Sequence, residues 1–221
     1  MTKDEIIQYI QNNQSLTGKE ILGFLNDQEA DEVNEVDSKK EYRVKGKLHR
    51  EDGPARIWSD GTKEWYLNGK CHREDGPAKE FSNGTKHWYL NGKRHRTDGP
   101  AVEYNNGDKY YYLNGLLHRT DGPAIIEDSN GYKEWYLNGK RHREDGPACE
   151  YLNGNKAWYI KGERHREDGP AIEWAASGEK EWWLNGERHR TDGPAILALN
   201  YKGNALDYKE WWINGKEVDP F

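Results

Sequence analysis

The sequence is poor in the residues that usually build a protein core. Leucine, isoleucine, valine and phenylalanine make up about 15% of the 221 residues, a fraction that by itself is typical of disordered chains. Two other features argue against disorder: the net charge is only −6, and the chain contains 10 tryptophan, 14 tyrosine and 3 phenylalanine residues. Because aromatic side chains bury a large area each, they can replace the missing aliphatic residues. We therefore expect a folded protein with an aromatic core.

Other absences limit where the protein works. No apolar run reaches 18 residues, and no basic, apolar and small segments follow one another at the N-terminus, so we expect neither a membrane span nor a secretory signal. The two cysteines, Cys71 and Cys149, occupy non-equivalent positions of an internal repeat, which is a poor disulfide framework. These features predict a soluble cytoplasmic protein with reduced thiols.

The negative charge is concentrated at one end. Residues 1–41 carry a balance of −6, so the remainder of the chain is neutral overall. Surfaces that bind nucleic acid or anionic membranes without sequence preference depend on an excess of positive charge. The neutral remainder therefore argues against such a surface, although it leaves a nucleic-acid partner open.

A seven-residue signature repeats along the chain. The string His-Arg-x-Asp-Gly-Pro-Ala occurs seven times, at intervals of 23 or 24 residues. The copies begin at His49, His72, His95, His118, His142, His165 and His189. This period is too short for a pair of helices, and it contains too many glycine turns.

Each repeat predicts a β-hairpin. The signature is followed by an alternating run, a pair such as Asn83-Gly84, and a Lys-x-Trp-Tyr-Leu-Asn-Gly segment. Asn-Gly between alternating runs indicates a type I′ turn, in which both central residues need positive φ. We therefore expect two strands per repeat. The first places Lys79 and Phe81 on one face; the residues equivalent to Phe81 are Trp58, Tyr104, Tyr151 and Trp174, with Glu127 as the exception.

The second strand separates two aromatic rows. Trp88 and Leu90 share one face, and His87 and Tyr89 share the other. The predicted core is the ladder of Trp65, Trp88, Tyr111, Trp135, Trp158, Trp182 and Trp211, flanked by Leu67, Leu90, Leu113, Leu137, Ile160, Leu184 and Ile213. The predicted fold is mainly β, an elongated twisted antiparallel sheet of about seven 23-residue β-hairpin repeats with a short N-terminal helical hairpin.

Three segments are predicted along the chain. Residues 1–26 form a helical hairpin, because Thr2-Lys3-Asp4-Glu5 and Thr17-Gly18-Lys19-Glu20 both have the spacing of a capping box, and each precedes an apolar face. Residues 27–41 form an acidic linker, and residues 42–221 form the repeat array. The helical hairpin either caps the first sheet edge or docks a partner through Ile7 and Leu22.

The spacing, the Asn-Gly-Lys-x-His segment and the aromatic residue before it resemble MORN repeats, a hairpin repeat that stacks into a long twisted sheet. The His-Arg-x-Asp-Gly-Pro-Ala form resembles tandem repeats in uncharacterised proteins of bacteria, bacteriophages and giant viruses. The resemblance covers Tyr42 to about Gly215, and it departs from the MORN pattern at Asp75-Gly76-Pro77. It implies scaffolding and protein–protein contact in a bacterial or infected host cell. Some bacterial members resemble antitoxins that hold a partner inactive.

The repeated histidine, arginine and aspartate residues of the signature favour a structural role over a catalytic one. An enzyme needs one constellation in one pocket, and zinc needs three or four convergent ligands, whereas these residues recur in equivalent positions. We expect no catalytic or metal-binding residues and no cofactor. We interpret the signature as structural, with an alternative in which its loop edge binds a nucleotide or nucleic acid. That edge comprises His72, Arg73, His95, Arg96, His118, Arg119, His142 and Arg143.

The row on the face opposite the predicted core favours binding. Aromatic rings with a polar edge on a rigid support are typical of interaction hot spots. This row comprises Tyr66, Tyr89, Tyr112, Tyr136, Tyr159, Trp183 and Trp212. The sequence therefore favours a non-enzymatic repeat scaffold that binds a macromolecule, most simply a protein, as an inhibitor in a phage–host or toxin–antitoxin conflict. The sequence leaves the oligomeric state undetermined.

Overall fold

The computed structural model describes residues 8, 32–36, 38–199 and 207–220. The predicted helical hairpin of residues 1–26, with Ile7 and Leu22, lies outside the described residues except for Gln8. The chain divides into two compact units, Met1–Asn105 and Asn106–Phe221. Within the described segments, no helix has the length and apolar character needed to cross a bilayer.

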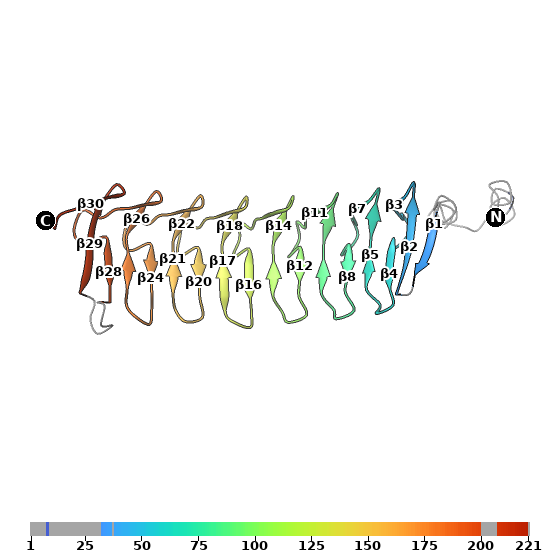
Figure 1. The fold of residues 1–221 in the computed structure, drawn as a ribbon, viewed down its shortest axis with the longest axis horizontal. Coiled ribbons are helices and arrows are strands. Elements are labelled where there is room, and N and C mark those ends of the chain that lie inside the picture. The colour runs from blue at the N-terminus through green and yellow to red at the C-terminus, as the bar shows by residue number, and fades with distance from the viewer. Residues whose placement is uncertain (1–7, 9–31, 37, 200–206, 221) are drawn as a thin grey trace. The chain divides into compact units, whose positions relative to one another are not determined.

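The N-terminal unit is an antiparallel sheet whose strands are added in chain order (Figure 1). The order is β1 (Glu32–Val36), β2 (Lys39–Val44), β4 (Arg56–Trp58), β5 (Lys63–Glu64), β8 (Lys79–Glu80), β9 (Lys86–His87) and β12 (Val102–Glu103). Short strands extend it as second hairpins: β3 (Lys47–Leu48) on β2, β6 (Tyr66–Leu67) with β7 (Lys70–Cys71), and β10 (Tyr89–Leu90) with β11 (Lys93–Arg94).

The C-terminal unit repeats this arrangement. Its antiparallel order is β13 (Lys109–Tyr110), β16 (Ile125–Glu127), β17 (Tyr132–Glu134), β20 (Cys149–Glu150), β21 (Lys156–Ala157), β24 (Ile172–Glu173), β25 (Lys180–Glu181), β28 (Ile196–Ala198) and β29 (Tyr208–Ile213). The second hairpins are β14 (Tyr112–Leu113) with β15 (Leu116–Leu117), β18 (Tyr136–Leu137) with β19 (Lys140–Arg141), β22 (Tyr159–Ile160) with β23 (Glu163–Arg164), β26 (Trp183–Leu184) with β27 (Glu187–Arg188), and β29 with β30 (Lys216–Val218). The prediction of a mainly β fold made of antiparallel hairpin repeats is confirmed.

Part of the predicted linker is a strand pair. β1 and the start of β2 lie within residues 27–41, and Glu35 pairs with Lys40 in an antiparallel register. Glu41, expected in the linker, is buried and bonds to Lys39, Arg43 and Arg56. The sequence suggested a linker because these residues are acidic and contain few apolar side chains, but backbone pairing and ion pairs stabilise them as strands.

Each repeat contains two hairpins of different turn type. At Asn83-Gly84 only the glycine has positive φ, and Gly84 N–H donates to Phe81 C=O at 2.9 Å, so the expected type I′ turn is wrong there. These bonds describe a type I turn followed by a glycine bulge. Both residues have positive φ in the second turn, at Asn91 (53°) and Gly92 (81°), so the type I′ turns close the second hairpins.

The most buried residues are not the predicted tryptophans. The alanine of every signature is fully buried: Ala55, Ala78, Ala101, Ala124, Ala148, Ala171 and Ala195. Its carbonyl accepts a hydrogen bond from the aromatic residue of the preceding strand, as from Trp65 N–H to Ala78 at 2.8 Å. This hydrogen bond ties the end of the signature loop to that strand, and the alanine methyl group beside it is inaccessible to solvent. The tryptophan ladder is half-buried, so the prediction that it forms the core is wrong in this respect.

Candidate partner-binding surfaces

Each signature loop places its arginine over an aromatic ring of the strand before it. The distances from the guanidinium carbon to the ring centroid lie between 3.9 and 4.1 Å. The pairs are Arg50 with Tyr42, Arg73 with Trp65, Arg96 with Trp88, Arg119 with Tyr111, Arg143 with Trp135, Arg166 with Trp158 and Arg190 with Trp182. This cation–π contact covers the flat side of the ladder in place of aliphatic packing.

The same guanidinium holds the loop together. Arg143 Nε donates to Asp145 at 2.8 Å, and its Nη1 donates to the Pro147 carbonyl at 3.2 Å and to Glu150 at 2.9 Å. The hydrogen bond and charge of Arg143 lower the pKa of Asp145. The predicted arginine edge is therefore engaged in the fold of each repeat, as the structural interpretation of the signature requires.

The outer surface of this loop edge is acidic. Side chains of Asp75, Asp98, Asp121, Asp145, Asp168 and Asp192 are 77–84% exposed, whereas their partner arginines are 20–22% exposed. Glu74, Glu144 and Glu167 are equally exposed. A ligand that approaches this edge meets carboxylates before it meets guanidinium groups.

The signature histidines connect one repeat to the next. His142 Nδ1 accepts a hydrogen bond from Lys161 N–H, in the type I′ turn of the following repeat, at 3.1 Å. The same bond joins His49 to Asn68, His72 to Asn91, His118 to Asn138, His165 to Asn185 and His189 to Asn214. An N–H that would otherwise remain unpaired at a turn is thus satisfied across the repeat boundary. Ligand binding by His72, His95, His118 and His142 stays a prediction.

Two aromatic rows share one face of each unit, which we call the aromatic face. In the N-terminal unit the His87 ring lies 5.0 Å from Phe81, 6.3 Å from Tyr89 and 5.9 Å from Tyr104, measured between centroids. Phe81 follows β8 and Tyr104 follows β12, and each of these strands is the first strand of its repeat's first hairpin. Tyr89 belongs to the predicted binding row. The predicted row therefore has a second row beside it, separated by a central line of side chains.

The C-terminal unit has the same face. Trp183 Nε1 donates to Glu181 at 2.9 Å, and Glu181 lies opposite Ile172 across the sheet. Because alternate residues of a strand share a face, Trp174 lies on the same face as Ile172. The equivalent positions of the repeats were enough to identify this second row from sequence, and its members are Trp58, Phe81, Tyr104, Tyr151 and Trp174. Its position beside the predicted row follows only from the register between strands.

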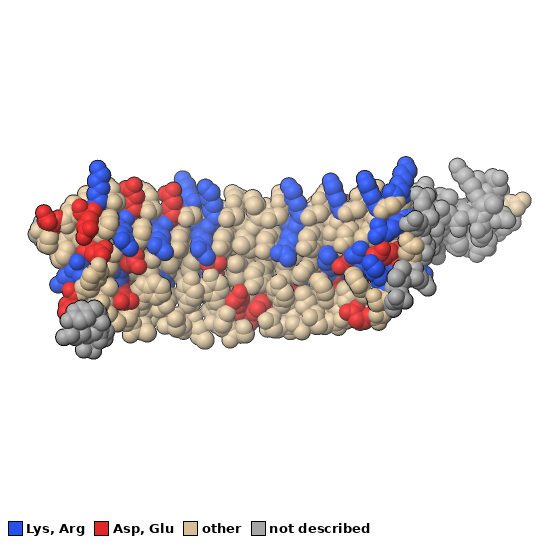
Figure 2. All heavy atoms as spheres, in the orientation of Figure 1, with Lys and Arg blue, Asp and Glu red and all other residues tan. Residues whose placement is uncertain are grey.

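The two rows overlap in exposure. In the second row Tyr104, Tyr151 and Trp174 are 40–42% exposed, whereas Trp58 and Phe81 are half-buried. The predicted row, Tyr66, Tyr89, Tyr112, Tyr136, Tyr159, Trp183 and Trp212, is half-buried. Arginines from the second hairpins lie over several of its rings, as Arg164 does at 4.8 Å from the Trp183 centroid. In Figure 2 uncharged side chains dominate the border of the first hairpin tips, and the opposite border carries basic side chains, joined by acidic ones toward the C-terminal end.

The opposite face of the first hairpins is charged and solvated. Its exposed lysines are Lys63, Lys86, Lys109, Lys133, Lys156, Lys180 and Lys209. Glutamates face several of them across the strands: Glu80 pairs in register with Lys63 and Lys86. Such alternating charges stabilise a sheet and keep it in water, and they provide an internal comparison for the aromatic face.

The two thiols are buried and protonated. Cys71 and Cys149 are free and buried, and burial raises the pKa of both thiols to about 12, so neither is a thiolate at neutral pH. Among the described residues, no three or more histidine, cysteine, aspartate or glutamate side chains converge as metal ligands do.

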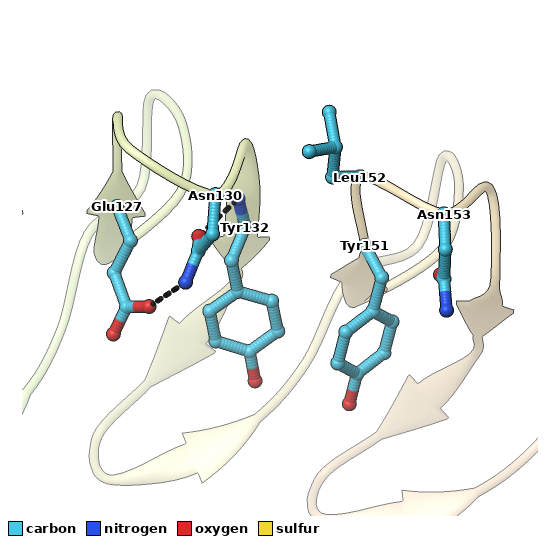
Figure 3. Close-up of a pocket in the computed structure, with 6 residues that line it drawn as sticks. All are labelled: Glu127, Asn130, Tyr132, Tyr151, Leu152 and Asn153. Atoms are coloured by element: carbon cyan, nitrogen blue, oxygen red, sulfur yellow. Dashed lines mark hydrogen bonds between the residues drawn. The ribbon is translucent and has the colours of Figure 1, made fainter.

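One groove interrupts the regularity of the aromatic face. It lies in the C-terminal unit between the β16–β17 tip and the residues after β20, has a volume of about 550 Å³, and is lined by Glu127, Asn130, Tyr132, Tyr151, Leu152 and Asn153 (Figure 3). The rings of Tyr132 and Tyr151 stack at 4.8 Å between centroids with 38° between their planes. Figure 3 shows these rings and the Glu127 carboxylate extending to the same side of the tips.

A search of protein-family models and of curated proteins finds no match to this chain. We therefore infer the function of the protein from the geometry of these surfaces.

Proposed function

We propose that the protein is a non-enzymatic repeat scaffold that binds a protein partner on its aromatic face. The observation that carries this proposal is the pair of aromatic rows on one face, with Tyr104, Tyr151 and Trp174 about two-fifths exposed. Rings fixed on hydrogen-bonded strands lose little conformational freedom when they are covered, so they can supply binding energy at low entropic cost.

The charge distribution supports a protein partner over a nucleic acid. Binding of a polyanion at the signature loops requires exposed positive charge, but the exposed groups there are carboxylates such as Asp98 and Glu144. The arginines of the same loops are held against aromatic rings. A nucleic acid would have to displace these internal contacts, whereas a protein can cover the aromatic face without disturbing them.

The resemblance to MORN repeats supports a scaffold and extends the proposal to inhibition. MORN-like arrays serve in protein–protein contact, and the similar repeats of phages and bacteria include antitoxin-like members. We therefore place the protein in a phage–host or toxin–antitoxin conflict, where it would hold a partner protein inactive by covering it. Ile7 and Leu22 of the predicted helical hairpin provide a second proposed docking element.

Affinity capture from the native host, with matched variants, tests the proposal. Tyr104→Ser combined with Trp174→Ser removes exposed rings from the aromatic face. We expect the captured protein to bind at least about tenfold more weakly, because two hot-spot rings are lost. The control, Lys86→Ser combined with Lys180→Ser, alters exposed side chains of the opposite face and should bind as the wild type does.

The outcomes separate the alternatives. Equal capture by both variants would contradict the aromatic face as the binding surface. If deletion of residues 1–31 abolishes capture and the ring variant does not, the helical segment is the docking element and the sheet is a spacer. Loss of capture in a single Arg119→Gln variant that circular dichroism shows to be folded at the assay temperature would favour the loop edge.

A further inference from the structure

The groove at Glu127 lies where the chain departs from its own repeat at several neighbouring positions. The repeat that begins at His118 is one residue longer than its neighbours, and Glu127 stands where Tyr104 and Tyr151 stand in equivalent repeats. Tyr132 replaces the threonine found at Thr85. Regular positions of a repeat are explained by cohesion, so a concentrated departure calls for another explanation.

The groove combines aromatic rings with a carboxylate that lacks a cation. Glu127 accepts hydrogen bonds from Tyr110 Oη and Asn130 Nδ2, both at 2.7 Å. Within the described part of the chain, no arginine or lysine forms an ion pair with it. Each carboxylate oxygen retains a lone pair for another donor. The exposed Asp128 is not among the residues that line the groove, because its carboxylate lies beside Gly107 of the preceding tip.

The rest of the molecule shows which group completes such an arrangement. Arg143 lies 4.0 Å above the Trp135 ring centroid and donates to Asp145, and the other signature arginines make the equivalent ring and carboxylate contacts. Arg56 similarly lies near Trp58 and bonds to Glu41 and Glu64. A ring, a carboxylate and a guanidinium group form a recurring set, and the groove provides the first two.

We propose that the groove of Tyr132, Tyr151 and Glu127 binds an arginine side chain of the partner protein. The planar guanidinium stacks on a tyrosine ring while its N–H groups donate to Glu127, a geometry that the compact lysine ammonium does not match. The exposed Leu152, at 75%, borders the groove and would contact the residue next to the arginine. This inference rests on the proposed function and names the chemistry of its partner.

The test uses the full chain and capped arginine, Nα-acetyl-arginine N-methylamide, as the probe. NMR shifts of the ring protons of Tyr132 and Tyr151 are followed during titration. We expect saturable shifts with the arginine probe, and at least about fivefold weaker binding of its neutral citrulline analogue, because the citrulline side chain carries no charge for Glu127.

Two variants make the result specific. Glu127→Gln keeps the shape of the side chain and should weaken arginine binding at least about fivefold. Glu127→Tyr restores the residue of the equivalent repeats, so it should keep the thermal stability of the wild type and lose arginine binding. Equal shifts from arginine and citrulline, no shift at either ring, or unchanged binding in Glu127→Gln would overturn the proposal.

This test is independent of the capture experiment. If the double variant at Tyr104 and Trp174 loses the partner but the groove does not bind the arginine probe, only the inference about the groove fails. If the groove binds arginine but the double variant keeps the partner, the proposed use of the aromatic face fails.

Discussion

At the scale of single residues, the signature arginine replaces the aliphatic packing that the composition lacks. Arg143 covers Trp135 and bonds to Asp145, the Pro147 carbonyl and Glu150. Arg143→Lys removes the planar stack and the fork of donors, so we expect a loss of about 2 kcal/mol in the free energy of unfolding, measured by urea denaturation. Asp145→Asn, at an exposed carboxylate, should cost much less. Equal losses in the two variants would contradict this role of the arginine.

His87 gives the molecule a pH dependence. Burial, with the charges of Arg94 and Lys79, lowers the pKa of His87 to about 4, and among the described residues its buried Nε2 has no hydrogen-bond partner. A histidine whose pKa is lowered on folding contributes full stability above its unfolded pKa of about 6.5 and loses it as the pH falls toward 4. His87→Ala, which places there the residue found at Ala157, removes this titration.

The measurement is the free energy of unfolding of both proteins at pH 7.5 and pH 4.5. We expect the wild type to lose about 1 to 2 kcal/mol more than His87→Ala over this interval, a value reduced for solvent screening of the ring. All other ionisable groups are the same in both proteins, so the comparison isolates the contribution of His87. If the free energies of unfolding of the wild type and His87→Ala differ by the same amount at both pH values, His87 is not buried in its neutral form.

At the scale of structural elements, repeats adhere through a bond from a histidine to the next type I′ turn. His142→Phe keeps a ring of similar size but removes the acceptor for Lys161 N–H. We expect the Lys161 amide to exchange with solvent deuterium about fivefold to tenfold faster, corresponding to one lost hydrogen bond. The Gly162 amide, which donates to the Arg141 carbonyl at 2.8 Å, should keep its protection. Unchanged exchange at Lys161 would contradict this link between repeats.

Turn chemistry made the hairpins predictable from sequence, but not every detail of them. Asn-Gly pairs correctly predicted antiparallel hairpins, yet the same pair forms a glycine bulge at Asn83 and a type I′ turn at Asn91, because the flanking strands set the register. The burial of Ala78 was not predictable, since it depends on tertiary packing around the signature loop rather than on the pattern of its strand. The stack of Arg73 on Trp65 was missed because the two residues lie on different elements, eight positions apart.

At the scale of the whole molecule, the surfaces of each unit have different chemistry. The lysine face is balanced by glutamates, the loop edge exposes carboxylates, and the aromatic face exposes rings. Hydrophobic contact depends weakly on salt, whereas contacts among exposed charges are screened. Association through the aromatic face should therefore persist at high ionic strength, with only the contribution of Glu127 reduced.

The most direct test of this account is hydroxyl-radical footprinting of the chain with and without its captured partner. Oxidation of exposed side chains is read residue by residue by mass spectrometry. We predict that the partner protects Tyr104, Tyr151 and Trp174 from oxidation, while rings that pack under the signature arginines, such as Trp65 and Trp158, react equally in both samples. Unchanged oxidation of Tyr104, Tyr151 and Trp174 in the complex would contradict the account.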